Sequence, residues 1–215
     1  MSFDTERRAL ADSCRRLAEE GLVIGSAGNL SVRSGDHVVV TPTGCLFEEV
    51  SADEMTVVDL GGAVQDGGRA PTSELGLHLG VYGRYDWAGA VAHTHSPVST
   101  AVGCVVDELP PVHYQMLSLG GAVRVAPYAT FGSDELHENV LAALEGHTAA
   151  LMQNHGTLTC GHSLDAAVDA TFLLEWACNL YWRAKQIGEP SVLTEDQLAD
   201  VATQVQRLNY GGGDG

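Results

Sequence analysis

The segment VAHTHSPVST, residues 91–100, places two histidines, His93 and His95, two positions apart. The residues from Ala88 to Ala92 are small or branched and apolar, which predicts a buried strand that runs into a loop. Because residues i and i+2 of a strand point to the same face, both imidazoles can aim at one point. Two converging imidazoles indicate a metal site.

Two further ligands can be chosen from segments elsewhere in the chain. His155 follows a second apolar segment and precedes a glycine, and Glu74 ends the run PTSE at residues 71–74, where a helix is expected to begin. Three histidines and a carboxylate form a plausible zinc shell. The remaining histidines lack such an arrangement and are assigned structural or surface roles: His37, His78, His113, His137, His147 and His162.

Composition limits the class of protein. A chain of 215 residues is long enough for one domain with a sizeable core and short for two. The formal net charge of −17 argues against nucleic acid or anionic membrane as partners, because their phosphates would be repelled. A small phosphorylated substrate stays compatible with this charge, since backbone N–H groups can bind a phosphate locally.

Three features predict a cytoplasmic protein. The chain starts with the charged sequence MSFDTERR, which is unlike a signal peptide, and it contains no apolar run long enough to span a bilayer. Its five cysteines are scattered, odd in number and free of CxxC motifs. They are typical of reduced thiols.

Helical and strand patterns alternate along the chain, which predicts a single α/β unit. By itself this alternation favours a parallel sheet. The expected helices are a first one that ends near Gly21, then 72–85 with Thr72 or Ser73 as cap, 133–145, 163–187 and 194–206; the expected strands include 37–41, 55–60, 123–128 and 149–153.

Small-residue loops form a second chemical feature. The pairs Gly28-Asn29, Thr43-Gly44 and Thr72-Ser73 lie at expected strand or helix edges and offer N–H or hydroxyl donors without bulk. The last pair precedes a helix, whose free N–H groups and dipole favour an anion. Other metal and nucleophile motifs are absent: the chain contains no HExxH, HxHxDH, GxSxG or Walker sequence.

Seven motifs carry a resemblance over essentially the whole chain: GSAGNLSVR, TPTG, PTSE, HTHS, VHYQM, APYATFGS and QNHG. In this order and spacing, the chain resembles class II aldolases of the fuculose-phosphate aldolase type. The resemblance implies a three-layer α/β/α fold with a central, largely antiparallel sheet, formed by one domain over residues 1–210. The glycine-rich sequence at 211–215 predicts a flexible tail. The resemblance also implies a homotetramer with active sites between subunits.

The resemblance further implies residue roles. His93, His95 and His155 bind zinc, and Glu74 is a fourth ligand that becomes the acid/base once substrate displaces it. Tyr114 reaches a neighbouring subunit's site to move the proton on the aldehyde oxygen, and Tyr210 closes over the substrate. The residues expected to bind substrate phosphate are Gly28, Asn29, Thr43, Gly44, Thr72 and Ser73.

The implied reaction is zinc-dependent cleavage of a ketose 1-phosphate, similar to L-fuculose 1-phosphate, to dihydroxyacetone phosphate and an aldehyde. Lys185, the only lysine, lies within the expected helix 163–187, which disfavours a Schiff-base mechanism. Aldolases for 5-deoxyribulose or methylthioribulose phosphate of nucleoside salvage remain alternatives, as do a sugar-phosphate 4-epimerase or dehydratase. A non-enzymatic adducin-like scaffold is disfavoured because Glu74 and the three histidines are all present.

Overall fold

The computed structural model describes residues 2–208, so Tyr210 and the predicted tail at 211–215 lie outside the described residues. The helices are α1 (Asp4–Glu19), η1 (Ala52–Glu54), α2 (Leu75–Arg84), α3 (Pro97–Gly103), η2 (Tyr114–Leu119), α4 (Asp134–Ala143), α5 (Leu164–Ile187) and α6 (Glu195–Leu208). The strands are β1 (Gly28–Ser34), β2 (His37–Val40), β3 (Thr56–Asp59), β4 (Val64–Asp66), β5 (Ala90–Thr94), β6 (Glu108–Leu109), β7 (Val123–Ala126), β8 (Ala149–Met152) and β9 (Gly156–Gly161).

The strands form one nine-stranded sheet in the order β4-β3-β2-β1-β5-β9-β8-β7-β6. Neighbouring strands are antiparallel except β7 and β8, which are parallel. The largely antiparallel sheet implied by the resemblance is therefore confirmed, and the parallel sheet favoured by the alternating pattern is wrong. The physical reason is that short turns join β1 to β2 and β8 to β9, and strands joined so tightly must run in opposite directions.

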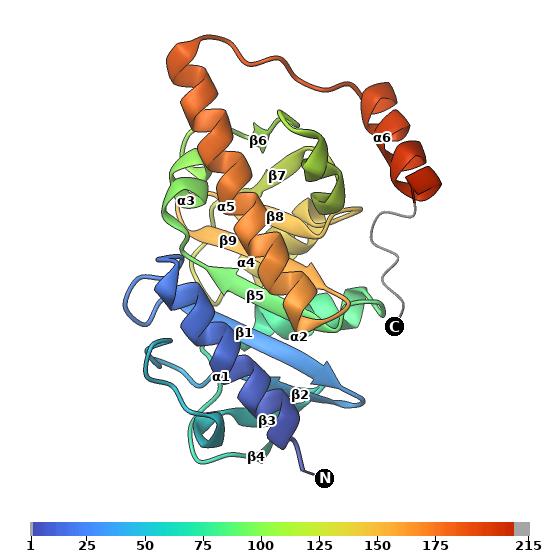
Figure 1. Ribbon diagram of the computed structural model, residues 1–215. Coiled ribbons are helices and arrows are strands. Elements are labelled where there is room, and N and C mark those ends of the chain that lie inside the picture. Colours follow the sequence, from blue (N-terminus) through green and yellow to red (C-terminus); the bar gives the residue numbers. More distant parts are fainter. Residues whose placement is uncertain (1, 209–215) are drawn as a thin grey trace.

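Helices cover both faces of the sheet, giving the predicted three layers in a single domain (Figure 1). Helices α1 and α5 cross one face, and α2 and α4 lie on the other. The central strand β5 is buried throughout, and its side chains alternate between the two cores. Ala90 and Ala92 belong to the core under α1 and α5, whereas Val91 belongs to the core under α2 and α4.

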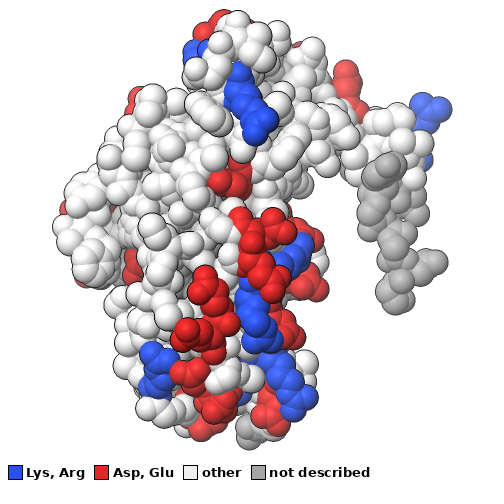
Figure 2. Space-filling view, turned by 60° about the vertical axis from the view of Figure 1, so that its left-hand side comes forward, with Lys and Arg blue, Asp and Glu red and all other residues white. Residues whose placement is uncertain are grey.

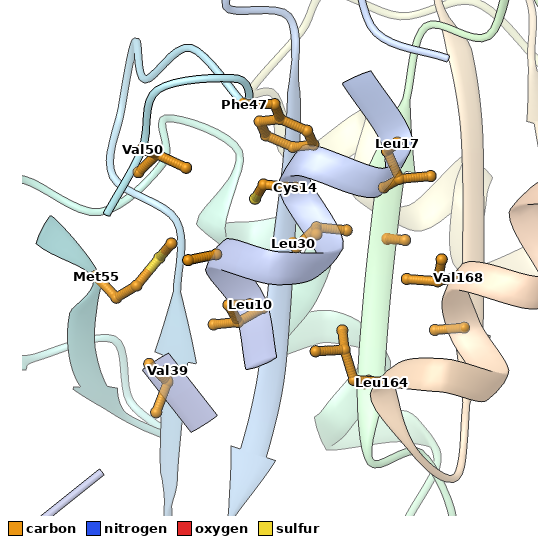
Figure 3. Close-up of a cluster of buried hydrophobic side chains, with 14 of the residues drawn as sticks. Leu10, Cys14, Leu17, Leu30, Val39, Phe47, Val50, Met55, Leu164 and Val168 are labelled. Atoms are coloured by element: carbon orange, nitrogen blue, oxygen red, sulfur yellow. The ribbon is translucent and has the colours of Figure 1, made fainter. Parts of the chain in front are cut away.

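The core under α1 shows why this helix packs where it does. Leu10, Cys14 and Leu17 recur along one face of α1 and contact the sheet at Leu30 and Val39 (Figure 3). Full burial of one such leucine contributes roughly 1.5–3 kcal/mol relative to an exposed one. This core fixes β1 against β2 and therefore fixes the strand that carries Asn29.

Most of the predicted helices are confirmed, with one shift that matters for the site. Ser133 and Ser163 cap α4 and α5 through hydrogen bonds accepted from backbone N–H groups. Helix α2 instead has Glu74 as its N-cap, so the predicted cap at Thr72 or Ser73 is wrong by one or two residues. Thr72 Oγ1 accepts a hydrogen bond from the Glu74 N–H at 3.2 Å, which delays the start of the helix.

The surface charges and the helix lengths bear on the expectations from charge and hydropathy. Acidic and basic side chains are interspersed on the lower half of the face in Figure 2, at the height of α1 in Figure 1, and this face shows no continuous basic patch. Among the described residues, no helix is both long and apolar enough to cross a bilayer. Helix α6 stands apart from the sheet and packs near η2.

Candidate functional site

The site lies where the central strands end. In the pairing of β1 with β5, Asn29 stands opposite His93, so both side chains project from the same face of the sheet. That face also carries α2, whose first turn begins at Glu74. His155 lies in the turn between β8 and β9, directly after Asn154, whose backbone adopts the left-handed conformation with φ of 55°.

The three predicted imidazoles converge on one point. Their ring centroids are 4.9–5.1 Å apart, and the ring planes are nearly perpendicular, at 74–86°. The Nε2 atoms of His93 and His95 are 3.1 Å apart. Glu74 Oε2 lies 3.1 Å from His93 Nε2, and Glu74 Oε1 lies 3.4 Å from His155 Nε2. Tetrahedral ligands of zinc stand about 3.3 Å apart for bonds of roughly 2.0–2.1 Å, so these spacings suit such an ion.

The protonation pattern also fits a cation. His93 Nδ1–H donates to the Thr157 carbonyl at 2.8 Å, which leaves His93 Nε2 with a lone pair facing the site. Burial, followed by the neighbouring imidazoles, lowers the pKa of His95 to about 4, and burial and His93 lower the pKa of His155. Glu74 Oε1 is buried without a hydrogen-bond donor. These lone pairs face one another, and a bound divalent metal would satisfy all of them.

Glu74 enters this cluster as a carboxylate. It is 7% exposed, and its Oε2 accepts a hydrogen bond from Asn29 Nδ2 at 3.1 Å. Burial opposes its ionisation, but hydrogen bonding within the cluster, including that from Asn29 Nδ2, outweighs burial and holds the pKa of Glu74 at about 2. A charged carboxylate beside three neutral imidazoles is a suitable donor set for zinc or a similar ion.

A cleft of about 430 Å³ opens beside the imidazoles. It contains every described residue predicted to bind phosphate, and Glu74, His95 and His155 line it as well; the predicted set is Gly28, Asn29, Thr43, Gly44, Thr72 and Ser73. None of the lining residues within the described chain is Lys or Arg. An anion there must be held by N–H and hydroxyl donors.

Sequence reasoning missed two groups of residues at the site. Tyr128, Ala129 and Phe131 also line the cleft, and the Phe131 side chain is 68% exposed there. The sequence signal for them was the presence of aromatic residues in the loop between β7 and α4. His78 is fully buried and bonds to Asn29, and its position four residues after Glu74 on the same helix could have indicated it.

The predicted aromatic residues lie differently. Tyr114 begins η2, is 52% exposed, and does not line the cleft of its own chain. Its ring lies 4.5 Å from the His113 ring, between centroids. Tyr210 is outside the described residues. The structure of one chain therefore brings together Glu74, the three histidines and the small-residue loops, but not Tyr114.

Comparison with known proteins agrees with this architecture. The chain belongs to the class II aldolase and adducin family, because residues 8–182 match that family's "Class II Aldolase and Adducin N-terminal domain". A 5-methylthioribulose-1-phosphate/5-deoxyribulose-1-phosphate aldolase of Rhodospirillum rubrum is 38% identical over 196 residues, which cover 91% of this chain and 88% of that protein. An L-fuculose phosphate aldolase of Escherichia coli K12 is 35% identical over 196 residues, covering 90% and 91%.

A solved structure of an L-fuculose 1-phosphate aldolase superposes with a TM-score of 0.92 at 34% identity, covering 96% of this chain and 98% of that one. The predicted resemblance to fuculose-phosphate aldolases and the predicted fold are thereby confirmed. The prediction that the protein is an enzyme of the class II aldolase type is confirmed as well.

Proposed function

We propose that the protein is a zinc-dependent aldolase that cleaves a ketose 1-phosphate to dihydroxyacetone phosphate and an aldehyde. The observation that carries this proposal is the convergence of three imidazoles and Glu74 on one wall of a cleft rich in uncharged hydrogen-bond donors. His93, His95 and His155 would hold the metal, with Glu74 as the fourth ligand. The bound metal supplies a Lewis acid for the negative charge that develops on the ketose oxygens.

The protein's own residues handle the protons. Glu74 is charged and adjoins the metal ligands, so it can receive and return a proton at the carbon where the bond is broken and formed. Three neutral imidazoles leave the metal most of its positive charge, which thiolate ligands would not. Glu74→Gln should keep much of the metal, because the imidazoles remain, and lose proton exchange at the carbon of dihydroxyacetone phosphate. Exchange at the wild-type rate in that variant would remove Glu74 from the mechanism.

Phosphate recognition follows from the donors in the cleft. Asn29, Thr43, Thr72 and Ser73 offer amide and hydroxyl groups, and α2 begins just beyond them. Hydrogen bonds to a charged group contribute about 1.5–3 kcal/mol each, and 1.4 kcal/mol is about a tenfold change in affinity. Ser73→Ala should therefore weaken the binding of a phosphorylated ketose about tenfold or more and leave the binding of the free ketose unchanged. Equal cleavage of both sugars by the wild-type protein would show that these loops are ordinary turns.

The exposed aromatic and apolar residues support a homotetramer with sites between subunits. Tyr114 is half exposed away from its own cleft, and α6 presents Val205 and Leu208 to solvent, 40% and 55% exposed. We propose that Tyr114 enters the neighbouring subunit's cleft and moves the proton on the aldehyde oxygen, with Tyr210 closing over the substrate. Subunits of the Tyr114→Phe and Glu74→Gln variants, mixed in one tetramer, should recover some activity. At some interfaces an intact Tyr114 of one subunit then meets an intact Glu74 of its neighbour. Verified mixed tetramers without recovery would place the site within one chain.

Two substrates deserve comparison. An L-fuculose 1-phosphate-like ketose is the first candidate. The second, 5-deoxyribulose or methylthioribulose 1-phosphate, is favoured by the 38% identity to the Rhodospirillum rubrum enzyme, whose name includes both. The exposed rings of Tyr128 and Phe131 in the cleft suit an aldehyde with a methyl or methylthio end in either case.

The test uses the purified, zinc-loaded protein with each ketose 1-phosphate and its unphosphorylated sugar. Aldehyde and dihydroxyacetone phosphate should be released in equal amounts from one of the candidates, and a chelator should abolish the activity that zinc or cobalt restores. His95→Ala should lose metal and activity, whereas His162→Ala, at an exposed position, should lose neither. Full activity of metal-free protein, or no cleavage of any ketose phosphate, would refute the proposal.

A further inference from the structure

A chain of buried hydrogen bonds runs from the last turn of α2 to the site. Tyr82 Oη lies 2.7 Å from Ser31 Oγ, and Ser31 Oγ lies 2.7 Å from His78 Nδ1. On the other side of the ring, His78 Nε2 lies 2.6 Å from Asn29 Oδ1. Asn29 Nδ2 completes the chain at Glu74 Oε2. Tyr82, Ser31 and His78 play no part in the proposed chemistry, yet all five groups are linked.

The direction of every proton in this chain follows from its last member. The Glu74 carboxylate can only accept, so the amide nitrogen of Asn29 must face it. The amide oxygen of Asn29 therefore faces His78 and must receive a proton from Nε2. With Nε2 protonated in the neutral ring, Nδ1 accepts from the Ser31 hydroxyl, and Ser31 in turn accepts from the Tyr82 hydroxyl. All donors point toward Glu74.

We propose that His78 is a positioning residue that fixes the side-chain amide of Asn29, so that Asn29 presents only N–H groups to Glu74 and to the phosphate in the cleft. This inference rests on the proposed function, in which Asn29 contacts the phosphate. One N–H of the amide is used by Glu74, and the second belongs to a side chain that lines the cleft. A flipped amide would aim its oxygen at a carboxylate and at an anion, and both contacts would be repulsive.

The surroundings of His78 make this orientation rigid. His78 and Ser31 are 0% exposed, so water cannot substitute for either partner. Burial, then His93, lowers the pKa of His78 to about 3, so the ring is neutral and carries a single N–H near neutral pH. Because Ser31 occupies Nδ1, that N–H remains on the side of Asn29.

The first test measures the tautomer of His78 in the wild-type protein. Nitrogen-15 NMR of histidine-labelled protein, with the His78 signals assigned by their loss in His78→Gln, should show the proton on Nε2 at neutral pH. It should do so without metal and without substrate, because the hydrogen bonds alone determine it. A proton on Nδ1 would overturn the inference, since His78 could then not donate to Asn29.

The second test measures affinity for dihydroxyacetone phosphate and for inorganic phosphate by calorimetry on the zinc-loaded protein. His78→Phe keeps a buried ring without the donor and should weaken the binding of both ligands about tenfold or more. His78→Gln, whose amide N–H can still reach toward Asn29, should recover most of that loss. Tyr82→Phe is the matched control: it removes a buried hydroxyl at the far end of the chain, and should lower the melting temperature with the dissociation constants unchanged.

Equal dissociation constants for wild type and folded His78→Phe would also overturn the inference, whatever happens to the melting temperature. Should His78→Phe fail to fold, the tautomer and the comparison of His78→Gln with Tyr82→Phe decide the question, because weaker binding by Tyr82→Phe than by His78→Gln would contradict it. The outcomes separate the two proposals. A protein that shows the Nε2–H tautomer and binds phosphate but cleaves no ketose phosphate refutes the proposed function and leaves the role of His78 intact.

Discussion

Gly156 is the first residue of β9 and lies close to the backbone and side chains of the segment that carries His93 and His95. A Cβ atom added there would lie 2.4 Å from the Thr94 carbonyl oxygen, 3.0 Å from His95 Cδ2 and 3.4 Å from His93 Cε1. An ordinary contact between carbon and carbonyl oxygen is roughly 3.3 Å or more, so β5 and β9 would have to separate by about 0.9 Å. Two of the three imidazoles would move with them. We therefore expect Gly156→Ala to damage the metal site and the sheet together.

The magnitude follows from the size of this displacement. Insertion of an extra methyl group into a packed interior costs about 1–3 kcal/mol. Each kcal/mol lowers the melting temperature by roughly 2–4 °C in a chain of this size, so the metal-free variant should melt about 2–12 °C below wild type. Displacement of groups that orient metal ligands typically lowers metal affinity by about 10–100-fold. Gly156 is not one of the glycines with a positive φ, so the expected effect of the substitution is steric.

The assay compares thermal unfolding of the metal-free protein with zinc titration of the folded protein. Gly83→Ala serves as the control, because no atom lies within 4 Å of its added methyl group and its exposed position on α2 favours alanine by up to about 1 kcal/mol. That variant should bind zinc as wild type does and melt at the same or a slightly higher temperature. Wild-type melting and wild-type zinc affinity in Gly156→Ala would refute the reasoning.

Three further predictions test the supports of the site. Glu175 accepts hydrogen bonds from two N–H groups at the start of α3 and from Ser99 Oγ, so Glu175→Gln should cost about 1–2 kcal/mol in unfolding free energy, measured by denaturant titration. Arg69 Nη2 donates to the Thr43 carbonyl at 3.0 Å, so Arg69→Met should raise KM for the phosphorylated ketose and leave zinc content unchanged. The pKa of His78 is lower in the folded protein, at about 3, than the usual 6.5, so unfolded chains bind the extra proton and unfolding free energy falls with decreasing pH between these values. The slope should reach up to about 1.4 kcal/mol per pH unit in metal-free protein and be smaller in His78→Gln; equal slopes would contradict this.

Much of the site could be predicted because strand geometry alone brings its first two ligands together. His93 and His95 flank one residue at the end of a buried strand, and the structure shows their Nε2 atoms 3.1 Å apart. The partner strand β9 is harder to predict from the sequence, because its buried residues include the polar Thr157 and Thr159. In the folded chain, their hydroxyls bond to Thr94 and Thr171. Buried threonines paired in this way remove the usual hydrophobic signal of a central strand.

The direction of the sheet and the second layer of the site depend on contacts between distant residues. The alternating pattern contains no information on the pairing of β1 with β5, which brings Asn29 opposite His93 across 64 positions. The sequence predicts a structural or surface role for His78, and its full burial agrees with a structural one. Its bond to Asn29 depends on how α2 lies on β1, which no local pattern determines.

The pairing of Asn29 with His93 restricts which changes of length the protein can accept. Successive strand residues face opposite sides, so insertion or deletion of one residue within β1 or β5 would turn one of these side chains into the core beneath α1 and α5. A two-residue change would restore the face but shift the side chain along the strand, away from Glu74. Length variation among related proteins should therefore concentrate outside these strands, at the exposed turn between β3 and β4 and in the segment that joins α5 to α6.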